Sequence, residues 1–123
     1  MDIFKHIAQL INQSEQTVVL TGAGISTESG LPDFRSDNGF WTKNKPIQFS
    51  EFIASEKKRR LSWDRNIELH SVLQNINPNL GHECVKKIIE LKQKNFLITQ
   101  NIDGLHQKTG TPINKTIEIH GNA

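Results

Sequence analysis

Three short, mostly apolar runs rich in β-branched residues constrain the fold of this 123-residue chain more than any other feature. They occupy residues 17–21, 96–99 and 116–119. Runs this short and this continuously apolar are typical of strands buried on both faces of a parallel sheet. Because helix-prone segments separate them, right-handed crossovers should connect the strands. The sequence therefore predicts an α/β fold with a parallel sheet and flanking helices.

Two segments outside these runs are predicted to be helices, and a third is predicted to be a loop. Apolar residues at spacings of three and four in residues 2–13 predict an amphipathic surface helix packed on the core. Residues 50–75 are helix-prone, with Ser50 as the expected N-cap. Residues 40–48 mix Trp, Lys, Asn and Pro without a period, which indicates a loop and a candidate lid.

The segment of residues 81–94 carries Cys84, Ile88 and Leu91 on one stripe with lysines opposite. This pattern predicts a second core-facing helix with Cys84 in a buried position. As the single cysteine, Cys84 cannot form an internal disulfide. It also has no partner cysteine at the spacing of a metal site, so no metal ligand is assigned.

The global charge does not indicate a polyanionic partner. Fifteen Lys and Arg against 13 Asp and Glu give a net charge of +2, so neither nucleic acid nor a membrane is expected as a partner. The basic run at residues 57–60 is interpreted as a solvated helix face. No stretch approaches the roughly 20 apolar residues that cross a bilayer, and no signal-peptide pattern opens the chain. We expect a reducing, cytoplasmic setting.

Each predicted strand ends in glycine or polar residues of the kind that build binding sites. The carboxyl ends of parallel strands meet at one edge of a sheet, and ligands bind in the crevice outside that edge. We therefore expect three motifs to converge on one pocket. They are Gly22-Ala23-Gly24, the polar turn at residues 100–104, and His120-Gly121.

The glycine motif that follows the first run allows backbone N–H groups to approach a phosphate. It is an incomplete dinucleotide fingerprint, because Thr27 occupies the third glycine position. No acidic residue follows a second strand about 20 positions on, as that fingerprint requires. Taken alone, the motif is equally compatible with a tight strand-to-helix turn that binds no ligand.

Asn101 and Asp103 stand on either side of Ile102, a spacing that in extended backbone points both side chains the same way. An Asx-type turn is the alternative, and it accounts for Asp103-Gly104 but not for the whole polar run. His120 lies at the carboxyl end of the last predicted strand. An imidazole can accept a hydroxyl proton near neutral pH, so His120 is the candidate general base. Four further histidines are interpreted as structural: His6, His70, His82 and His106.

The three motifs together closely resemble the signatures of the sirtuin family, and they occur in the family's order. The residues that carry the resemblance are Gly22-Ala23-Gly24-Ile25-Ser26-Thr27-Glu28-Ser29-Gly30-Leu31-Pro32-Asp33-Phe34-Arg35-Ser36, Thr99-Gln100-Asn101-Ile102-Asp103-Gly104-Leu105-His106, Ile117-Glu118-Ile119-His120-Gly121 and Pro78-Asn79-Leu80-Gly81-His82. Residues 1–123 are thereby identified as the N-terminal portion of one sirtuin-type NAD-binding catalytic domain, apparently truncated. The implied fold is a partial Rossmann-like sheet without the family's zinc module.

The resemblance implies NAD-dependent removal of acyl groups from lysine in a protein or peptide. The acyl group would pass to ADP-ribose with release of nicotinamide, so that NAD is a co-substrate. By resemblance, the catalytic residues are His120, Asn101 and Asp103. The implied cofactor-binding residues are Gly22, Ala23, Gly24, Ser26, Asp33, Phe34, Arg35, Trp41, Gln100, Asn101, Ile102 and Asp103.

The family resemblance implies distinct tasks within this set. Gly22, Ala23, Gly24 and Ser26 would line the NAD phosphates, and Arg35 would help position the cofactor. Asp103 and the Ile102 backbone would bind the nicotinamide carboxamide, Asn101 would order the adjoining ribose and water, and Gln100 would bind a ribose. Phe34 would shield the reacting ribose carbon from water, with core packing as its alternative. Asp33 could instead form a turn after Pro32.

Two alternatives to deacylation stay open from the sequence. The chain could be an inactive fragment that binds NAD or ADP-ribose weakly, or it could carry ADP-ribosyltransferase or NAD-hydrolysing activity. Sirtuins that favour acidic acyl groups carry a Tyr and an Arg three residues apart, whereas this chain has no Tyr and reads Leu61-Ser62-Trp63-Asp64-Arg65 in the comparable segment. This difference favours acetyl over succinyl groups.

Overall fold

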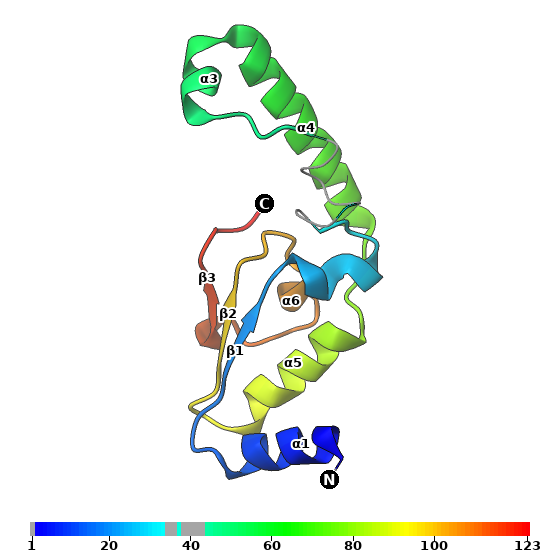
Figure 1. The fold of residues 1–123 in the computed structure, drawn as a ribbon, viewed down its shortest axis with the longest axis vertical. Helices are drawn as coiled ribbons and strands as arrows, with labels where there is room; N and C mark the ends of the chain where they lie inside the picture. Colours follow the sequence, from blue (N-terminus) through cyan, green and yellow to red (C-terminus); the bar gives the residue numbers. More distant parts are fainter. Residues whose placement is uncertain (1, 34–36, 38–43) are drawn as a thin grey trace.

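The computed structural model describes residues 2–33, 37 and 44–123 (Figure 1). Within these ranges the chain alternates helices and strands, as an α/β fold requires. In chain order the elements are α1 (Ile3–Gln13), β1 (Val18–Thr21), the 3-10 helix η1 (Ala23–Ser29), α3 (Phe49–Ala54), α4 (Glu56–Asn75), α5 (Leu80–Leu91), β2 (Phe96–Thr99), α6 (Leu105–Lys108), the 3-10 helix η2 (Ile113–Lys115) and β3 (Thr116–Glu118).

The three strands form one parallel sheet in the order β1-β2-β3, which confirms the predicted sheet. The register aligns Thr21 with Thr99 and Thr99 with Glu118, so all three strands end at the same level. Figure 1 shows these carboxyl ends directed toward the side of the molecule from which α4 rises. The strand-end motifs therefore share one edge of the sheet.

The core lies between the sheet and α5. Val85 and Ile89 of α5 pack with Leu97 of β2, and Val19 and Ile25 pack against this cluster. Asn95 lies at the end of this core where β1 begins. Its buried side chain accepts the Thr17 N–H at 2.8 Å and donates to the Ile88 carbonyl at 2.6 Å. A satisfied buried amide of this kind fixes the start of β1 against the end of α5.

The prediction of which face of α5 packs against the core was wrong. His82, Val85 and Ile89 are the buried residues, whereas Cys84 is exposed and Leu91 is 55% exposed. Successive helical residues point about 100° apart, so two neighbouring stripes of this sequence are both plausible by apolar spacing. The face that is buried includes His82, and a search for apolar residues does not count a histidine.

The predicted burial of the sheet on both faces was also wrong. Val18 and Leu20 of β1 are 52% and 63% exposed, whereas Thr21 is buried. Side chains alternate between faces along a strand, so one face of the sheet is covered and the other is open. No described helix packs on the open face.

The amphipathic helix α1 forms as predicted, but it has no buried residue, so its predicted packing on the core is not observed. Phe4 on its apolar face is 78% exposed. The helix is tied to the domain by a polar contact instead. The Lys92 ammonium donates to the Ile11, Asn12 and Ser14 carbonyls at the carboxyl end of α1, where helix carbonyls lack partners.

The helix predicted over residues 50–75 is two helices, α3 and α4. Ser55 separates them in an extended conformation, and its hydroxyl accepts the Lys58 N–H at 3.3 Å. Ser55, which lies inside the predicted helix, is therefore the N-cap of α4. The sequence had predicted Ser50 as the N-cap of one continuous helix. Arg59 of the basic run donates to the Phe52 and Ile53 carbonyls, so this run serves the junction between the two helices.

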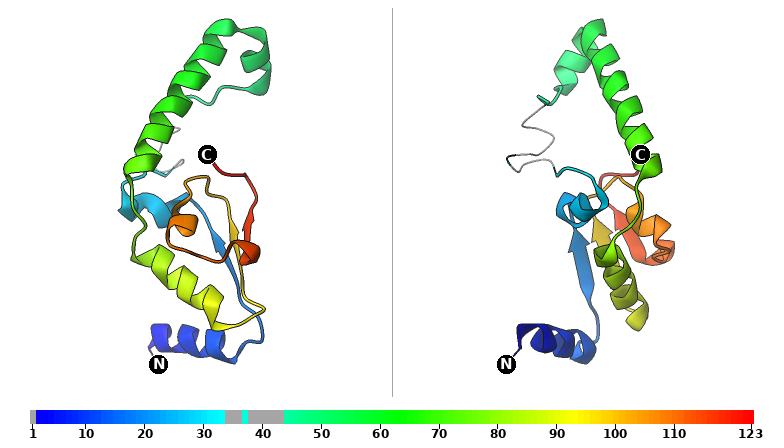
Figure 2. Two further views of the ribbon diagram at one scale, coloured as in Figure 1. Left: turned by 180° about the vertical axis from the view of Figure 1, so that it is seen from behind. Right: turned by 90° about the vertical axis from the view of Figure 1, so that its right-hand side faces the viewer.

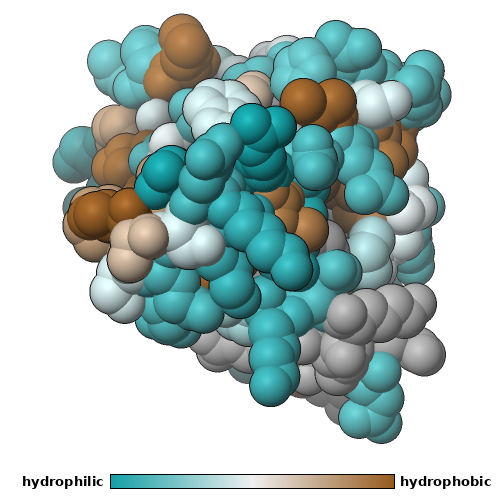
Figure 3. Space-filling view, turned by 90° about the horizontal axis from the view of Figure 1, so that it is seen from above, coloured by the Kyte–Doolittle hydropathy of each residue, from teal (hydrophilic) through white to brown (hydrophobic). Residues whose placement is uncertain are grey.

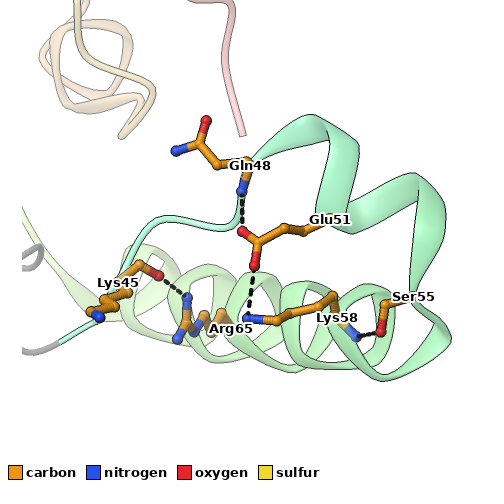
Figure 4. A network of polar contacts seen from close by, with 6 residues as sticks. All are labelled: Lys45, Gln48, Glu51, Ser55, Lys58 and Arg65. Atoms are coloured by element: carbon orange, nitrogen blue, oxygen red, sulfur yellow. Dashed lines mark hydrogen bonds and ion pairs between the residues drawn. The ribbon is translucent and has the colours of Figure 1, made fainter.

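Polar contacts hold the α3–α4 hairpin together (Figure 4). Glu51 accepts the Gln48 N–H at 3.0 Å and pairs with the Lys58 ammonium at 3.2 Å. The Arg65 guanidinium donates to the Lys45 carbonyl at 2.9 Å, which fixes the approach to α3 against α4. Seen from this end, the molecule is mainly hydrophilic with separate hydrophobic spots (Figure 3). In the described ranges no helix is long and apolar enough to cross a membrane.

Candidate functional site

A cavity of about 450 Å³ lies at the carboxyl edge of the sheet, between the strand ends and α4. Each of the three strand-end motifs contributes to it, as the sequence predicts. From the sheet side it is lined by Ala23, Ser26, Leu31, Pro32, Gln100, Asn101, Ile102, Asp103 and His120, and from the other side by Ile47, Ser62, Arg65, Asn66, Leu69 and Leu73.

The Ser26 hydroxyl is the centre of the polar contacts in this cavity. It is 1% exposed and donates to the Asp103 carboxylate at 2.6 Å. The Asn101 side-chain amide donates to the same hydroxyl oxygen at 3.4 Å. Asn101 and Asp103 thus both point toward η1, which confirms the orientation inferred from their spacing around Ile102.

The loop that carries Asn101 and Asp103 is rigidly anchored. The Asn101 side chain donates to the Gly22 carbonyl at 3.1 Å, and its backbone N–H donates to the Thr99 hydroxyl at 3.1 Å. Asp103 also accepts the Leu105 N–H at 3.0 Å, which is the Asx-type turn considered as an alternative. Asp103 therefore both starts α6 and faces the cavity.

His82 is fully buried beside the cavity without lining it, which agrees with the structural role expected from the sequence, and it contacts the Ser26 hydroxyl. Its Nδ1 accepts the Asn79 N–H at 3.1 Å, so Nε2 carries the hydrogen and donates to the Ser26 hydroxyl at 3.4 Å. Burial lowers the pKa of His82, and the Asp103 carboxylate only partly opposes this. A neutral His82 consequently positions the Ser26 hydroxyl so that its proton points at Asp103.

His106 forms the second buried imidazole, with its ring centroid 5.0 Å from that of His82. The Thr21 hydroxyl donates to Thr99 at 2.9 Å, so its oxygen accepts from the His106 Nε2–H at 2.9 Å. Burial lowers the pKa of His106 to about 4, and the charge interaction with the neighbouring His82 acts in the same direction. The Asp103 carboxylate acts in the opposite direction. In the described part of the chain its Nδ1 is buried without a hydrogen-bond partner. His106 is therefore neutral near pH 7 and ties α6 to the strand ends.

His120 differs from these two residues because its side chain is exposed and borders the cavity. It follows β3 by two residues, and the main chain around it is fixed on both sides. The Ile119 N–H donates to the Thr99 carbonyl at 3.1 Å, and the Ala123 N–H donates to the Ile102 carbonyl at 3.0 Å. Gly121 adopts a φ of +76°, the left-handed turn that lets the chain fold back over Ile102.

Not every residue of the predicted set borders the cavity. Gly22 and Gly24 flank the lining residue Ala23 without lining the cavity themselves, and Asp33 follows the lining residue Pro32. The predictions for Phe34, Arg35 and Trp41 lie outside the described residues. The described ranges contain no cluster of His, Cys, Asp and Glu arranged to hold a metal.

The wall that α4 contributes was missed by the sequence reasoning. Ser62, Arg65, Asn66, Leu69 and Leu73 line the cavity and recur at spacings of three and four, which is one face of a helix. Because this face mixes polar and apolar residues, a search for apolar periodicity does not detect it. A search for any helical stripe that faces the strand ends would have found it.

A parallel sheet with flanking helices and a cavity outside the carboxyl ends of its strands is the arrangement of Rossmann-like α/β domains. The Sir2 family profile matches residues 22–123. The chain is 41% identical to NAD-dependent protein deacetylase 1 of Bradyrhizobium diazoefficiens over 96% of its own length and 46% of the relative's. It is 44% identical to an NAD-dependent protein deacetylase of Thermodesulfovibrio yellowstonii, over 93% and 44%. The chain belongs to the Sir2 family, the sirtuins.

Solved structures agree with this assignment. A mutant Sir2 homologue in complex with ADP-ribose superposes with a TM-score of 0.86 at 31% identity, covering 99% of this chain and 47% of the other. A Sir2 complex with a p53 peptide and NAD+ superposes with a TM-score of 0.73 at 40% identity, over 99% and 47%. This chain therefore spans slightly less than half the length of the relatives it matches.

Proposed function

We propose that this chain supplies the nicotinamide side and the general base of an NAD-dependent protein lysine deacylase. In that reaction the acyl group of an acyl-lysine protein or peptide passes to ADP-ribose, and nicotinamide is released. The observation that carries the proposal is the convergence of Ser26, Asn101, Asp103 and His120 on one cavity. It is supported by a relative named as an NAD-dependent protein deacetylase and by related structures that contain ADP-ribose or a p53 peptide with NAD+.

The polar groups of the cavity fit NAD chemically. Among the described residues the Asp103 carboxylate accepts two hydrogen bonds, from the Ser26 hydroxyl and from the Leu105 N–H, and a carboxylate can accept about four. Capacity remains for an amide donor such as a carboxamide. At Gly24, an added Cβ would meet no atom of the described residues within 4 Å, which leaves room for an approaching phosphate.

Among the histidines in and around the site, His120 is the one whose side chain a bound ligand can reach. His82 and His106 are buried with lowered pKa values, and their ring nitrogens contact Asn79, Ser26 and Thr21. His120 is exposed at the cavity edge, where it can accept a proton from a bound hydroxyl and release it to water. Its task is general base, and those of Asn101 and Asp103 are binding and orientation.

We also propose that the acyl group is short and neutral, with acetyl preferred, and that the protein acts in the cytoplasm. The α4 wall of the cavity carries Leu69 and Leu73, which suit an apolar acyl chain. Arg65, the cation of this wall, donates to the Lys45 carbonyl. The +2 net charge gives no reason to expect a nucleic-acid partner.

Nicotinamide release, measured with and without an acetyl-lysine peptide, tests the proposed function. Release should require the peptide, and His120→Ala should slow removal of the acetyl group from the peptide by about 10²–10⁴-fold, the usual contribution of a general base, while leaving NAD binding largely intact. His6→Ala is the matched control, because His6 is exposed on α1 far from the cavity. Release without the peptide would indicate ADP-ribosyl transfer or NAD hydrolysis. Binding of ADP-ribose without any release would indicate a binding fragment.

A further inference from the structure

The wall that α4 contributes to the cavity is attached to the sheet at its carboxyl end. Figures 1 and 2 show α4 extending away from the sheet, with this end nearest to the strands. Leu73, in the last turn of α4, is its buried residue, and α3 is the described element against which α4 packs most extensively. The position of the wall therefore depends on the contacts that hold this end.

Lys108 holds the carboxyl end of α4. Its ammonium donates to the Leu73 carbonyl at 2.9 Å and to the Ile76 carbonyl at 3.1 Å. The last carbonyls of a helix lack partners within the helix and carry a partial negative charge, so an ammonium group stabilises them. Because Lys108 is the last residue of α6, these two hydrogen bonds join the ends of α4 and α6.

The helix α6 is itself fixed to the strand ends. At its start the Asp103 carboxylate accepts the Leu105 N–H, and further along the His106 imidazole forms a hydrogen bond with the Thr21 hydroxyl at 2.9 Å. The side chains of Leu105 and His106 are both buried. Lys108 therefore connects the α4 wall to the loop that carries Asp103 on the opposite side of the cavity.

The connection between α4 and α5, residues 76–79, is held at both ends. At one end the Asn79 side chain donates to the Ile25 carbonyl at 2.7 Å and to the Ser29 hydroxyl at 3.0 Å, both in η1. At the other end the Lys108 ammonium bonds the first carbonyl of the connection. Loss of this ammonium would leave Asn79 in place and free the end of α4, so that α4 could turn about the connection.

We propose that Lys108 is a positioning residue for the acyl-lysine substrate. Its side chain does not line the cavity, and it acts on the cavity through the main chain of α4. By fixing where α4 stands against the strand ends, it sets how closely Leu69 and Leu73 approach an acyl-lysine side chain. The effect on this substrate rests on the proposed function, whereas the attachment of α4 can be measured without turnover.

Residual dipolar couplings of the isotope-labelled 123-residue chain measure the attachment of α4. In the unmodified chain the couplings of α4 and of the three strands should fit one common alignment. Lys108→Met keeps an alkyl stem and removes the donors, so the couplings of α4 should shrink relative to those of the strands. Lys108→Arg keeps a cationic donor and should restore the common alignment. Lys87→Met, which alters an exposed lysine of α5, is the control and should leave the alignment unchanged.

Steady-state deacetylation of an acetyl-lysine peptide measures the consequence for the substrate. In Lys108→Met, KM for the peptide should rise about tenfold, the loss expected from about one charged hydrogen bond, while kcat should change less than about threefold. Lys108→Arg should recover the original KM. The affinity for ADP-ribose should stay the same, because the residues proposed to bind the cofactor lie on the sheet side of the cavity.

Three results would overturn the proposal. They are couplings of α4 that keep the common alignment in Lys108→Met, a Lys108→Arg variant that behaves like Lys108→Met, and a fall in kcat without a rise in KM. Absence of turnover in the unmodified chain would instead refute the proposed function, and the dipolar couplings would then decide the attachment of α4 on their own.

Discussion

At the scale of single residues, the Ser26 hydroxyl connects the parts of the site. It receives a hydrogen bond from His82 and donates one to Asp103, so a residue of α5 and a residue of the loop after β2 meet through it. Because Ser26 is fully buried, these partners cannot be replaced by water without rearrangement. The arrangement holds Asp103 in one orientation before any ligand binds.

Removing this hydroxyl should destabilise the fold. Ser26→Ala deletes a buried hydrogen bond to a carboxylate, so the free energy of unfolding should fall by about 1.5–3 kcal/mol. Thr27→Ala is the control, because the Thr27 hydroxyl is exposed and donates to the Gly24 carbonyl, and its loss should cost under about 1 kcal/mol. Urea unfolding of the three proteins measures the difference. Equal costs for the two variants would refute the central role of Ser26.

The buried imidazole of His106 should make stability depend on pH. Its pKa is lowered from 6.5 to about 4, chiefly by burial. The unfolded chain therefore takes up this proton at a higher pH than the folded protein does. The stabilising contribution is complete above about pH 6.5 and is lost as the pH falls toward about 4, at about 1.4 kcal/mol per pH unit. The lowered pKa of His82 acts in the same direction.

Urea unfolding between about pH 7 and about pH 4.5 measures this dependence. The slope should be shallower in His106→Gln than in the unmodified chain, whatever the effect of that variant on stability itself. His70→Gln, which alters an exposed imidazole on α4, should retain the full slope. Identical slopes in all three proteins would show that His106 does not titrate with unfolding.

The sequence predicts the residues of the strand ends well, because glycine and polar residues interrupt apolar runs there. Asn101, Asp103 and His120 were singled out in this way, whereas Ser26 was assigned through the family resemblance, and their roles stay predictions. The role of His82 could not be predicted, since it depends on how α5 is rotated about its axis. That rotation is set by packing of Val85 and Ile89 against Leu97, which no local pattern contains.

At the scale of elements, α1 is attached mainly by its carboxyl end. It has no buried residue, while the Lys92 ammonium bonds three carbonyls in the segment that ends the helix. Lys92→Met should therefore release α1, and its amide hydrogens should exchange about tenfold faster or more, as in locally opening segments. Lys94→Met alters a neighbouring exposed lysine and should not change the exchange. Unchanged exchange in Lys92→Met would mean that other contacts hold the helix.

The positions of the helices and strands along the chain were predicted more reliably than the burial of their side chains. The three strands and the helices α1, α4 and α5 appear close to where periodicity and propensity indicate. The break at Ser55 was missed because the segment is helix-prone on both sides of a residue that suits an N-cap. Burial was overestimated on β1 and α1, since apolar patterns show which surfaces need covering but not whether the partner lies in the same 123 residues.

At the scale of the whole molecule, the chain has three distinct surfaces around one sheet. One face is packed by α5 and α6, the carboxyl edge opens into the cavity, and the other face exposes the apolar side chains of Val18, Leu20 and Ile117. The cavity brings residues from all three strand-end motifs together.

The central claim is that three separate strand ends form one nucleotide-binding site. The most direct test is a titration of the isotope-labelled chain with ADP-ribose, followed by nuclear magnetic resonance at each backbone amide. The claim predicts that η1, the loop of residues 100–104 and the residues around His120 shift together with a single dissociation constant, while η2 does not shift. Shifts confined to one of the three segments, or none at millimolar ligand, would contradict it.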